Sequence, residues 1–151
     1  MDFKNLKPSV DFKDPATLCT LGGCVILFFA SFLPIVKVLG DTESLMGGNH
    51  HGILHLILVI AIAALVVFNL EKIASGVMAA EIIWAIWDIR SVGSDVSDAN
   101  KLYKAFTGEN AASLQIAFYL LIIGAIALVA GLVLIGMRSK KSTQAPAQPM
   151  M

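Results

Sequence analysis

The sequence has few charged residues and no excess of either sign. Charged side chains make up 15% of the 151 residues, and 11 basic residues balance 11 acidic ones. Nucleic-acid-binding domains usually carry a basic patch and a high isoelectric point, whereas this chain has a pI near 6.8. We therefore expect no nucleic-acid partner.

Cysteine is also scarce, and familiar catalytic motifs are absent. Cys19 and Cys24 are the only cysteines, and their spacing places them on different sides of a helix, which does not bring the sulfurs together. The sequence contains neither a zinc-protease motif nor a phosphate-binding loop. We expect two free thiols, no enzyme activity and no cofactor.

Apolar residues form 57% of the chain, with a mean hydropathy of +0.79, and they come in long blocks. A helix needs about 20 apolar residues to cross a bilayer, and open strands would leave backbone groups unpaired in lipid. The sequence therefore predicts an all-α integral membrane protein, a bundle of four transmembrane helices in the lipid bilayer. The expected parts are an N-terminal segment at 1–15, spans at 16–38, 53–70, 73–89 and 112–137, outer loops at 39–52 and 90–111, and a tail at 138–151.

Local signals refine the ends of these spans. Asp14 and Pro15 suit the N-cap and first turn of the first helix, and Pro34 either kinks that helix or ends it. Only Glu71 and Lys72 separate the second and third blocks, so these helices should form an antiparallel hairpin packed side by side. The polar, proline-containing tail is expected to be disordered.

Lysine and arginine are unevenly distributed between the two sides of the predicted bundle. With both termini on one side, that side holds seven of these residues near the spans and the other side holds four. Because positive residues accumulate on the cytoplasmic side, we expect cytoplasmic N- and C-termini in a multi-pass plasma-membrane protein. The absence of an Asn-x-Ser/Thr sequon favours a bacterial inner membrane.

The second outer loop has a pattern of its own. Residues 95–106 place Val96, Leu102, Tyr103 and Phe106 among charges, which predicts a short amphipathic helix that ends at Gly108. Such a helix either caps the bundle or lies on the bilayer surface.

Glu81 lies near the middle of the third predicted span, roughly 12 Å below its outer end at the rise of an α-helix. Counting along the other spans places Ser31 and Tyr119 in the same layer, with His55 closer to the outer surface. Ionised carboxylates at this depth are costly and usually face a partner or a water pathway. Glu81 therefore either forms a proton or cation site with these residues, or holds helices together as a protonated hydrogen-bond donor.

Asp88 lies two helical turns beyond Glu81 on the same face, with Trp84 between them. This stripe suits the outer mouth of a pathway through the bundle. Alternatively, Asp88 is an ordinary interfacial polar residue, and Trp84 and Trp87 belong to an aromatic belt.

His50, His51 and His55 gather where the first outer loop meets the second helix. The four-residue spacing of His51 and His55 places both imidazoles on one helical face, which suits zinc or copper. A complete metal site needs further ligands, and a pH-sensing role is an equal alternative.

Two functions follow from these observations. The absence of catalytic motifs favours a non-enzymatic scaffold or accessory subunit of a membrane complex, with a membrane-protein partner or self-association. The small residues of the third and fourth helices suit close packing within the monomer, or alternatively between copies. The buried carboxyl of Glu81 favours instead an oligomeric channel or proton-coupled transporter.

Overall fold

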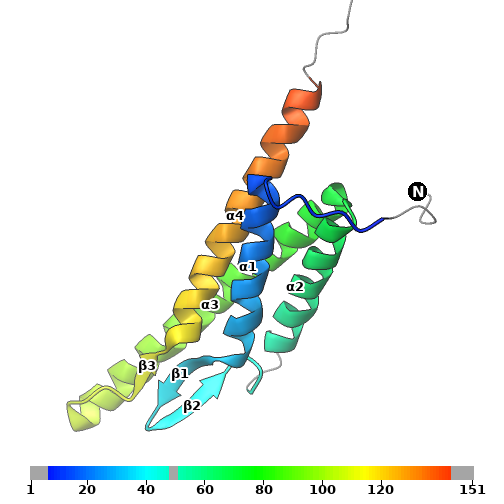
Figure 1. Cartoon of the computed structure of the whole chain (residues 1–151). Coiled ribbons are helices and arrows are strands. Elements are labelled where there is room, and N and C mark those ends of the chain that lie inside the picture. The colour runs from blue at the N-terminus through cyan, green and yellow to red at the C-terminus, as the bar shows by residue number, and fades with distance from the viewer. Residues whose placement is uncertain (1–6, 48–50, 144–151) are drawn as a thin grey trace, which may run out of the picture.

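A computed structural model of the chain describes residues 7–47 and 51–143. These residues form helices α1 (Pro15–Phe32), α2 (His51–Val67), α3 (Glu71–Thr107) and α4 (Ile116–Thr143), and strands β1 (Pro34–Val38), β2 (Asp41–Ser44) and β3 (Ala112–Leu114). In Figure 1 the strands gather at one end of the bundle, and α1 begins near its opposite end. We call these the sheet end and the terminal end.

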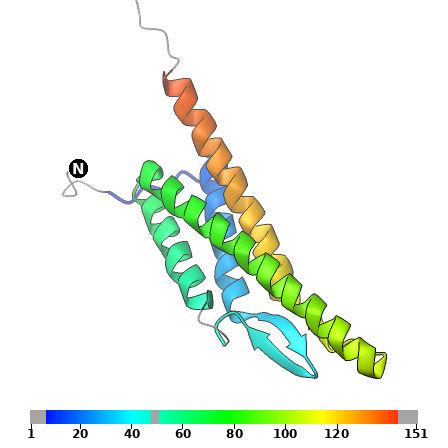
Figure 2. The ribbon, with the colours of Figure 1, turned by 180° about the vertical axis from the view of Figure 1, so that it is seen from behind.

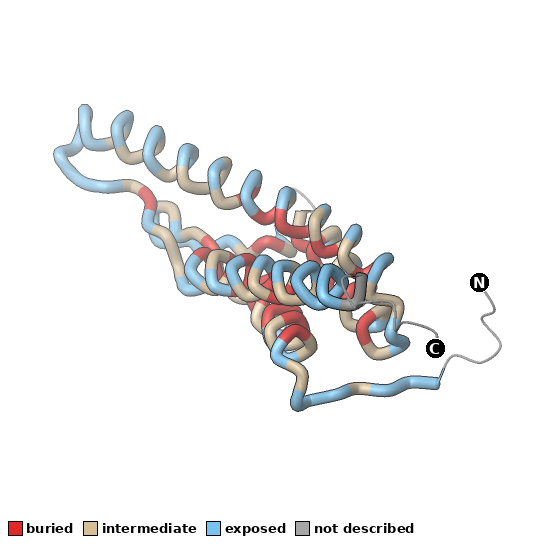
Figure 3. The backbone as a smooth tube through the Cα atoms, turned by 90° about the horizontal axis from the view of Figure 1, so that it is seen from above, coloured by how far each residue is buried: buried red, intermediate tan, exposed pale blue. Residues whose placement is uncertain are grey.

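The four helices pack in a ring. The main contacts of α1 are with α2 and α4, and those of α3 are with the same two helices. Figure 3 shows the buried positions on the faces that the helices turn toward one another. By length and composition, α1 and the stretch Ile116–Lys141 of α4 could each cross a membrane, and α2 is a shorter apolar helix.

The first helix starts where the sequence predicts and stops earlier. The Asp14 carboxylate accepts a hydrogen bond from the Thr17 backbone N–H at 2.9 Å, with Pro15 in the first turn. The expected span of 16–38 is wrong at its other end, because α1 stops at Phe32 and 34–38 is a strand. Pro34 has no backbone N–H for a helix and forces Leu33 into extended backbone.

A small sheet at the sheet end departs from the predicted all-α fold. Its strand order is β2-β1-β3, with both pairs antiparallel. A two-residue turn joins β1 to β2 with positive φ at Leu39 and Gly40, 50° and 104°, the left-handed pair that tight hairpins require. Residues 39–44 of the expected loop at 39–52 therefore form the turn and second strand of a hairpin, and the fourth expected span loses its first residues, 112–114, to β3.

The third helix is one continuous element of 37 residues, seen from behind in Figure 2. The expected span of 73–89 and the separate helix in the loop at 90–111 are therefore parts of α3. No proline interrupts 90–107, so the backbone continues through the polar segment. The predicted end is confirmed, because Gly108 takes a left-handed conformation with φ 80°.

The polar end of α3 is attached to the sheet by one side chain. The Asn100 amide donates to the Ala112 carbonyl at 2.8 Å, and the Ala112 backbone N–H donates to the Asn100 carbonyl oxygen at 2.7 Å. This two-point contact holds β3 beside residues 90–107 of α3, which we call the extension of α3.

At the terminal end the predicted α2–α3 hairpin is present, although the expected span of 53–70 is displaced to His51–Val67. Asn69 has a positive φ of 56° in the three-residue turn. The helix α4 runs on to Thr143, so the prediction of disorder from 138 is wrong as far as 143. The remaining residues of the expected tail lie outside the described part.

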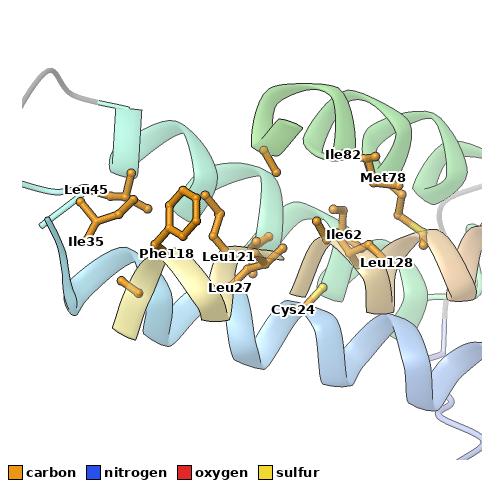
Figure 4. Close-up of a cluster of buried hydrophobic side chains, with 14 of the residues drawn as sticks. Cys24, Leu27, Ile35, Leu45, Ile62, Met78, Ile82, Phe118, Leu121 and Leu128 are labelled. Atoms are coloured by element: carbon orange, nitrogen blue, oxygen red, sulfur yellow. The ribbon is translucent and has the colours of Figure 1, made fainter. Parts of the chain in front are cut away.

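The core lies between all four helices (Figure 4). Leu27, Ile62, Leu121 and Leu128 are almost fully buried there. Small residues allow α1 and α4 to approach closely, since a Cβ added at Gly124 would lie 2.6 Å from the Leu27 side chain. These positions of α4 thus pack within the chain.

Candidate functional site

A buried histidine joins two carboxyl groups on neighbouring helices. His55 of α2 contacts Glu81 of α3 through Nδ1 and Oε1 at 2.5 Å, and contacts Asp88 of α3 through Nε2 and Oδ2 at 2.8 Å. The seven-residue spacing places both carboxyls on one face of α3. The imidazole therefore bridges two turns of the facing helix.

All three side chains are removed from solvent. His55 and Glu81 are 0% exposed and Asp88 is 3% exposed. Burying unpaired charges costs several kcal/mol, so the two carboxyls and the imidazole must nearly neutralise one another. With both carboxyls ionised and one proton added to His55, the group carries one negative charge, and a second proton makes it neutral. The group is thus chemically able to hold or release a proton.

One oxygen of the group has no partner. Glu81 Oε2 is buried and has no hydrogen bond within the described residues. It leaves a position where a proton on Glu81 does not displace the contact with His55. Oε1 can accept a hydrogen bond from His55 whether Glu81 is ionised or carries a proton on Oε2.

His51 and two tryptophans lie beside Asp88. The His51 Nδ1 atom is 3.4 Å from Asp88 Oδ1, and His51 stacks against Trp84 and Trp87 with ring centroids 5.8 and 5.2 Å away. Trp84 Nε1 is buried without a hydrogen bond in the described structure. Of the predicted mouth residues, Asp88 is thus part of the bridge that His55 forms between Glu81 and Asp88, here called the His55 bridge, and Trp84 adjoins it through His51.

The structure brings together only part of the predicted polar site. Glu81 and His55 meet, but Ser31 of α1 is buried and donates to the Leu27 carbonyl of its own helix at 2.9 Å. Tyr119 is 55% exposed on the outside of α4 and contacts the Phe118 ring. Counting depth along each span does not show which way a side chain faces, and this explains both differences.

The predicted metal site stays a prediction, because His50, one of its three ligands, is not among residues 7–47 and 51–143. No group of three or more His, Cys, Asp or Glu side chains is placed there to hold a metal ion. His51 and His55 instead turn toward carboxyls of α3, and His50 lies outside the described residues.

A pocket of about 300 Å³ opens above Asp88 at the sheet end. It lies between the sheet and the extension of α3, and His51, Trp87, Asp88, Asp95 and Glu43 line it together with apolar side chains. The His55 bridge therefore connects the floor of this pocket to Glu81 in the bundle.

Toward the terminal end, the hydrogen-bonded chain of described residues stops at Glu81. Met78 and Ala74 continue its face of α3 and are fully buried, as is Leu128 of α4. Thr20 of α1 is buried too, but its hydroxyl donates to the Ala16 carbonyl of its own helix. The polar group is thus connected to one end of the molecule.

Sequence reasoning missed that His55 bridges both carboxyls, although the hairpin contains the signal. In an antiparallel hairpin that turns at Asn69, His55 lies as far before the turn as position 83 lies after it, so the two should face each other. Position 83 falls between Glu81 and Asp88. The pocket had no such signal, because the strands that form its wall were not predicted.

The fold and this group define a mostly helical protein in which two helices are long and apolar enough to span a membrane and a histidine pairs with two buried carboxyls. Comparison with protein-family models, with curated proteins and with solved structures finds no match.

Proposed function

We propose that the chain is a non-enzymatic, four-span accessory subunit of a bacterial plasma-membrane complex, and that Glu81, His55 and Asp88 bind and release a proton from its sheet side. The proposal rests above all on the bridge from His55 to two buried carboxyls, one of which forms the floor of a pocket. A proton gained or lost there changes a buried charge, and buried charge is costly enough to shift how α2 packs against α3.

The outward faces of the helices support four spans. Each helix exposes large apolar side chains away from its neighbours: Phe29 of α1 is 57% exposed, Ile57 of α2 57%, Ile83 of α3 69% and Ile126 of α4 63%. An apolar surface around all four helices suits lipid contact, whereas monomeric soluble proteins rarely expose large contiguous apolar patches. Lysine and arginine counts favour a cytoplasmic terminal end, which leaves the sheet end outside.

Proton uptake is tested by infrared difference spectroscopy of the protein in lipid nanodiscs between neutral and acidic pH. We expect a carbonyl band of a buried carboxylic acid that resists rapid hydrogen exchange, and Glu81→Gln should remove or shift it. Asp98→Asn is the matched control, because Asp98 is on the same helix with a side chain 70% exposed. A band that is unchanged in Glu81→Gln and in Asp88→Asn contradicts the proposal.

The accessory role is supported by the extension of α3. Leu102 is 69% and Phe106 83% exposed, one helical turn apart on one face beyond the bundle. A photocrosslinking residue at Phe106, compared with one at Ile83 on the lipid-facing side, should capture a distinct membrane-protein partner in native membranes. Purified protein that moves a solute, with no partner captured at Phe106, overturns this role.

A proton-coupled transporter or oligomeric channel is the second candidate. The unpartnered Glu81 Oε2 favours it, while the apolar residues between Glu81 and the terminal end require a second conformation or a second copy for passage. Flux of protons or solute into proteoliposomes that Glu81→Gln abolishes would favour transport over the accessory role. Flux that is absent, or equal in both proteins, removes this candidate.

A further inference from the structure

The pocket at the sheet end has acidic side chains on three elements. Glu43 comes from β2, Asp95 from the extension of α3, and Asp88 forms the floor. No lysine or arginine lines this pocket within the described residues. The neighbouring Lys37 lies on the opposite side of β1, where it lines another cavity. Asp88 is paired with His55, so the negative charge that no described lysine or arginine of the pocket offsets is that of Glu43 and Asp95.

These carboxyls retain free hydrogen-bonding capacity. Glu43 and Asp95 have neither an ion pair nor a side-chain hydrogen bond in the described structure. The Asp88 side chain is only 5% exposed, and its Oδ1 accepts no hydrogen bond, its nearest partner being His51 Nδ1 at 3.4 Å. The Oδ1 atom of Asp88 can therefore accept a hydrogen bond from a donor bound in the pocket that Asp88 lines.

The arrangement suits an organic cation better than a metal ion. No three ligands among the described residues converge on one metal position, so the carboxyls are spread along the cavity. Trp87 lines the same pocket, and indole faces attract ammonium groups. Ile35 and Val92 add apolar wall beside them, which suits a short alkyl chain between charged ends.

We propose that this pocket binds an aliphatic amine, most tightly a diamine whose two ammonium groups contact Asp88 on the floor and Asp95 or Glu43 near the rim. This goes beyond the proposed proton uptake, because Glu43 and Asp95 lie outside the His55 bridge. The ligand would enter from the sheet side and would not have to pass through the bundle.

Calorimetric titration of the full chain in nanodiscs of neutral lipid with cadaverine tests this binding. We expect cadaverine to bind more tightly than pentylamine, and neutral pentanol to bind least. Asp95→Asn and Glu43→Gln should each weaken cadaverine binding by roughly two- to five-fold, as for partly exposed ion pairs. Added salt should weaken it further, because screening acts on exposed charges.

Asp98→Asn is the matched control, since Asp98 is an exposed acid of α3 that does not line the pocket, and it should leave the affinity unchanged. Cadaverine that does not bind, or that binds equally to wild type and to Glu43→Gln/Asp95→Asn, overturns the proposal. Magnesium that binds more tightly than cadaverine, with the same dependence on these carboxyls, also overturns it. Because these variants leave Glu81 and His55 intact, failure here is distinguishable from failure of proton uptake in the infrared experiment.

Discussion

At the scale of single residues, His55 compensates two carboxyl groups that water does not reach. Its imidazole contacts both Glu81 and Asp88, so its removal leaves both without a partner. Breaking a buried pair by removing one partner costs about 3–5 kcal/mol. We expect His55→Ala to lower the free energy of unfolding by this amount, measured by denaturant titration in mixed micelles.

The control for this prediction removes the carboxyls as well. His55→Ala combined with Glu81→Gln and Asp88→Asn leaves no uncompensated charge, so it should recover much of the lost stability. If the triple variant is as unstable as the single one, the loss reflects the cavity left by the ring and not the buried charge.

Asp14 gives a prediction of pH dependence at the terminal end. Burial acts to raise its pKa, but hydrogen bonds from Thr17 and the charge of Arg138, 2.9 Å away, outweigh this effect and hold the pKa below its ordinary value of 3.8. A pKa lowered by folding adds stability above 3.8, and this stability is lost as the pH falls through the folded-state pKa.

We therefore expect Asp14→Asn to cost up to about 1 kcal/mol at neutral pH, through the lost charge at a helix N-terminus and the lost ion pair. The difference from wild type should vanish in strong acid, where Asp14 is protonated in both states. Unfolding titrations at neutral and acidic pH measure it, with Asp41→Asn on the exposed strand β2 as the control. A difference that persists unchanged in acid contradicts the electrostatic origin.

At the scale of elements, the contact between α1 and α4 depends on glycine. A Cβ at Gly124 would lie 2.6 Å from the Leu27 side chain, whereas at Gly76 of α3 it would meet nothing within 4 Å. We expect Gly124→Ala to destabilise the protein by about 1–3 kcal/mol through overpacking. Gly76→Ala should be neutral or stabilising by up to about 1 kcal/mol, because alanine favours helix. Equal effects of the two variants in unfolding titrations would contradict this packing.

Helical segments were predictable because apolar periodicity and capping signals act locally. Asp14, Pro15 and Gly108 mark ends that the structure confirms. Strand β1 was not predictable in this way, because its apolar residues continue the run of α1 and its partners lie both next to it and at 112–114. The long α3 was missed because charges in 90–107 resemble a loop when a membrane boundary is assumed at residue 89.

The site was predictable as far as its residue types. An isolated Glu81 in an apolar segment and a nearby histidine are visible in the sequence, and the structure brings them together. To predict whether Ser31 and Tyr119 face Glu81, one must know how each helix is rotated about its own axis. That rotation depends on packing between helices, such as the approach at Gly124, and spacing within one segment does not contain it.

At the scale of the whole molecule, the number of spans can be decided by labelling from one side. If α1 and α4 alone crossed the membrane, everything between them, including the α2–α3 turn, would lie on one side. If all four helices cross, Lys72 at that turn lies with the termini and Asp98 lies opposite. Lys72 is exposed and the Asp98 side chain is 70% exposed, so cysteines at both positions should be reachable.

We expect a membrane-impermeant maleimide to label Asp98→Cys in spheroplasts, in which the outer layers of the cell are removed and the inner membrane stays closed. Lys72→Cys should be labelled only after the membrane is opened, as should Lys140→Cys on the exposed end of α4. Each variant is made in a background with Cys19→Ser and Cys24→Ala, because both native thiols are free. Labelling of Lys72→Cys before opening, with Lys140→Cys still protected, would establish two spans, and the His55 bridge would then lie in an extramembrane bundle. Protection of Lys72→Cys together with free labelling of Asp98→Cys places Glu81 within the bilayer, where a change of its charge is costly enough to alter the packing of α2 against α3.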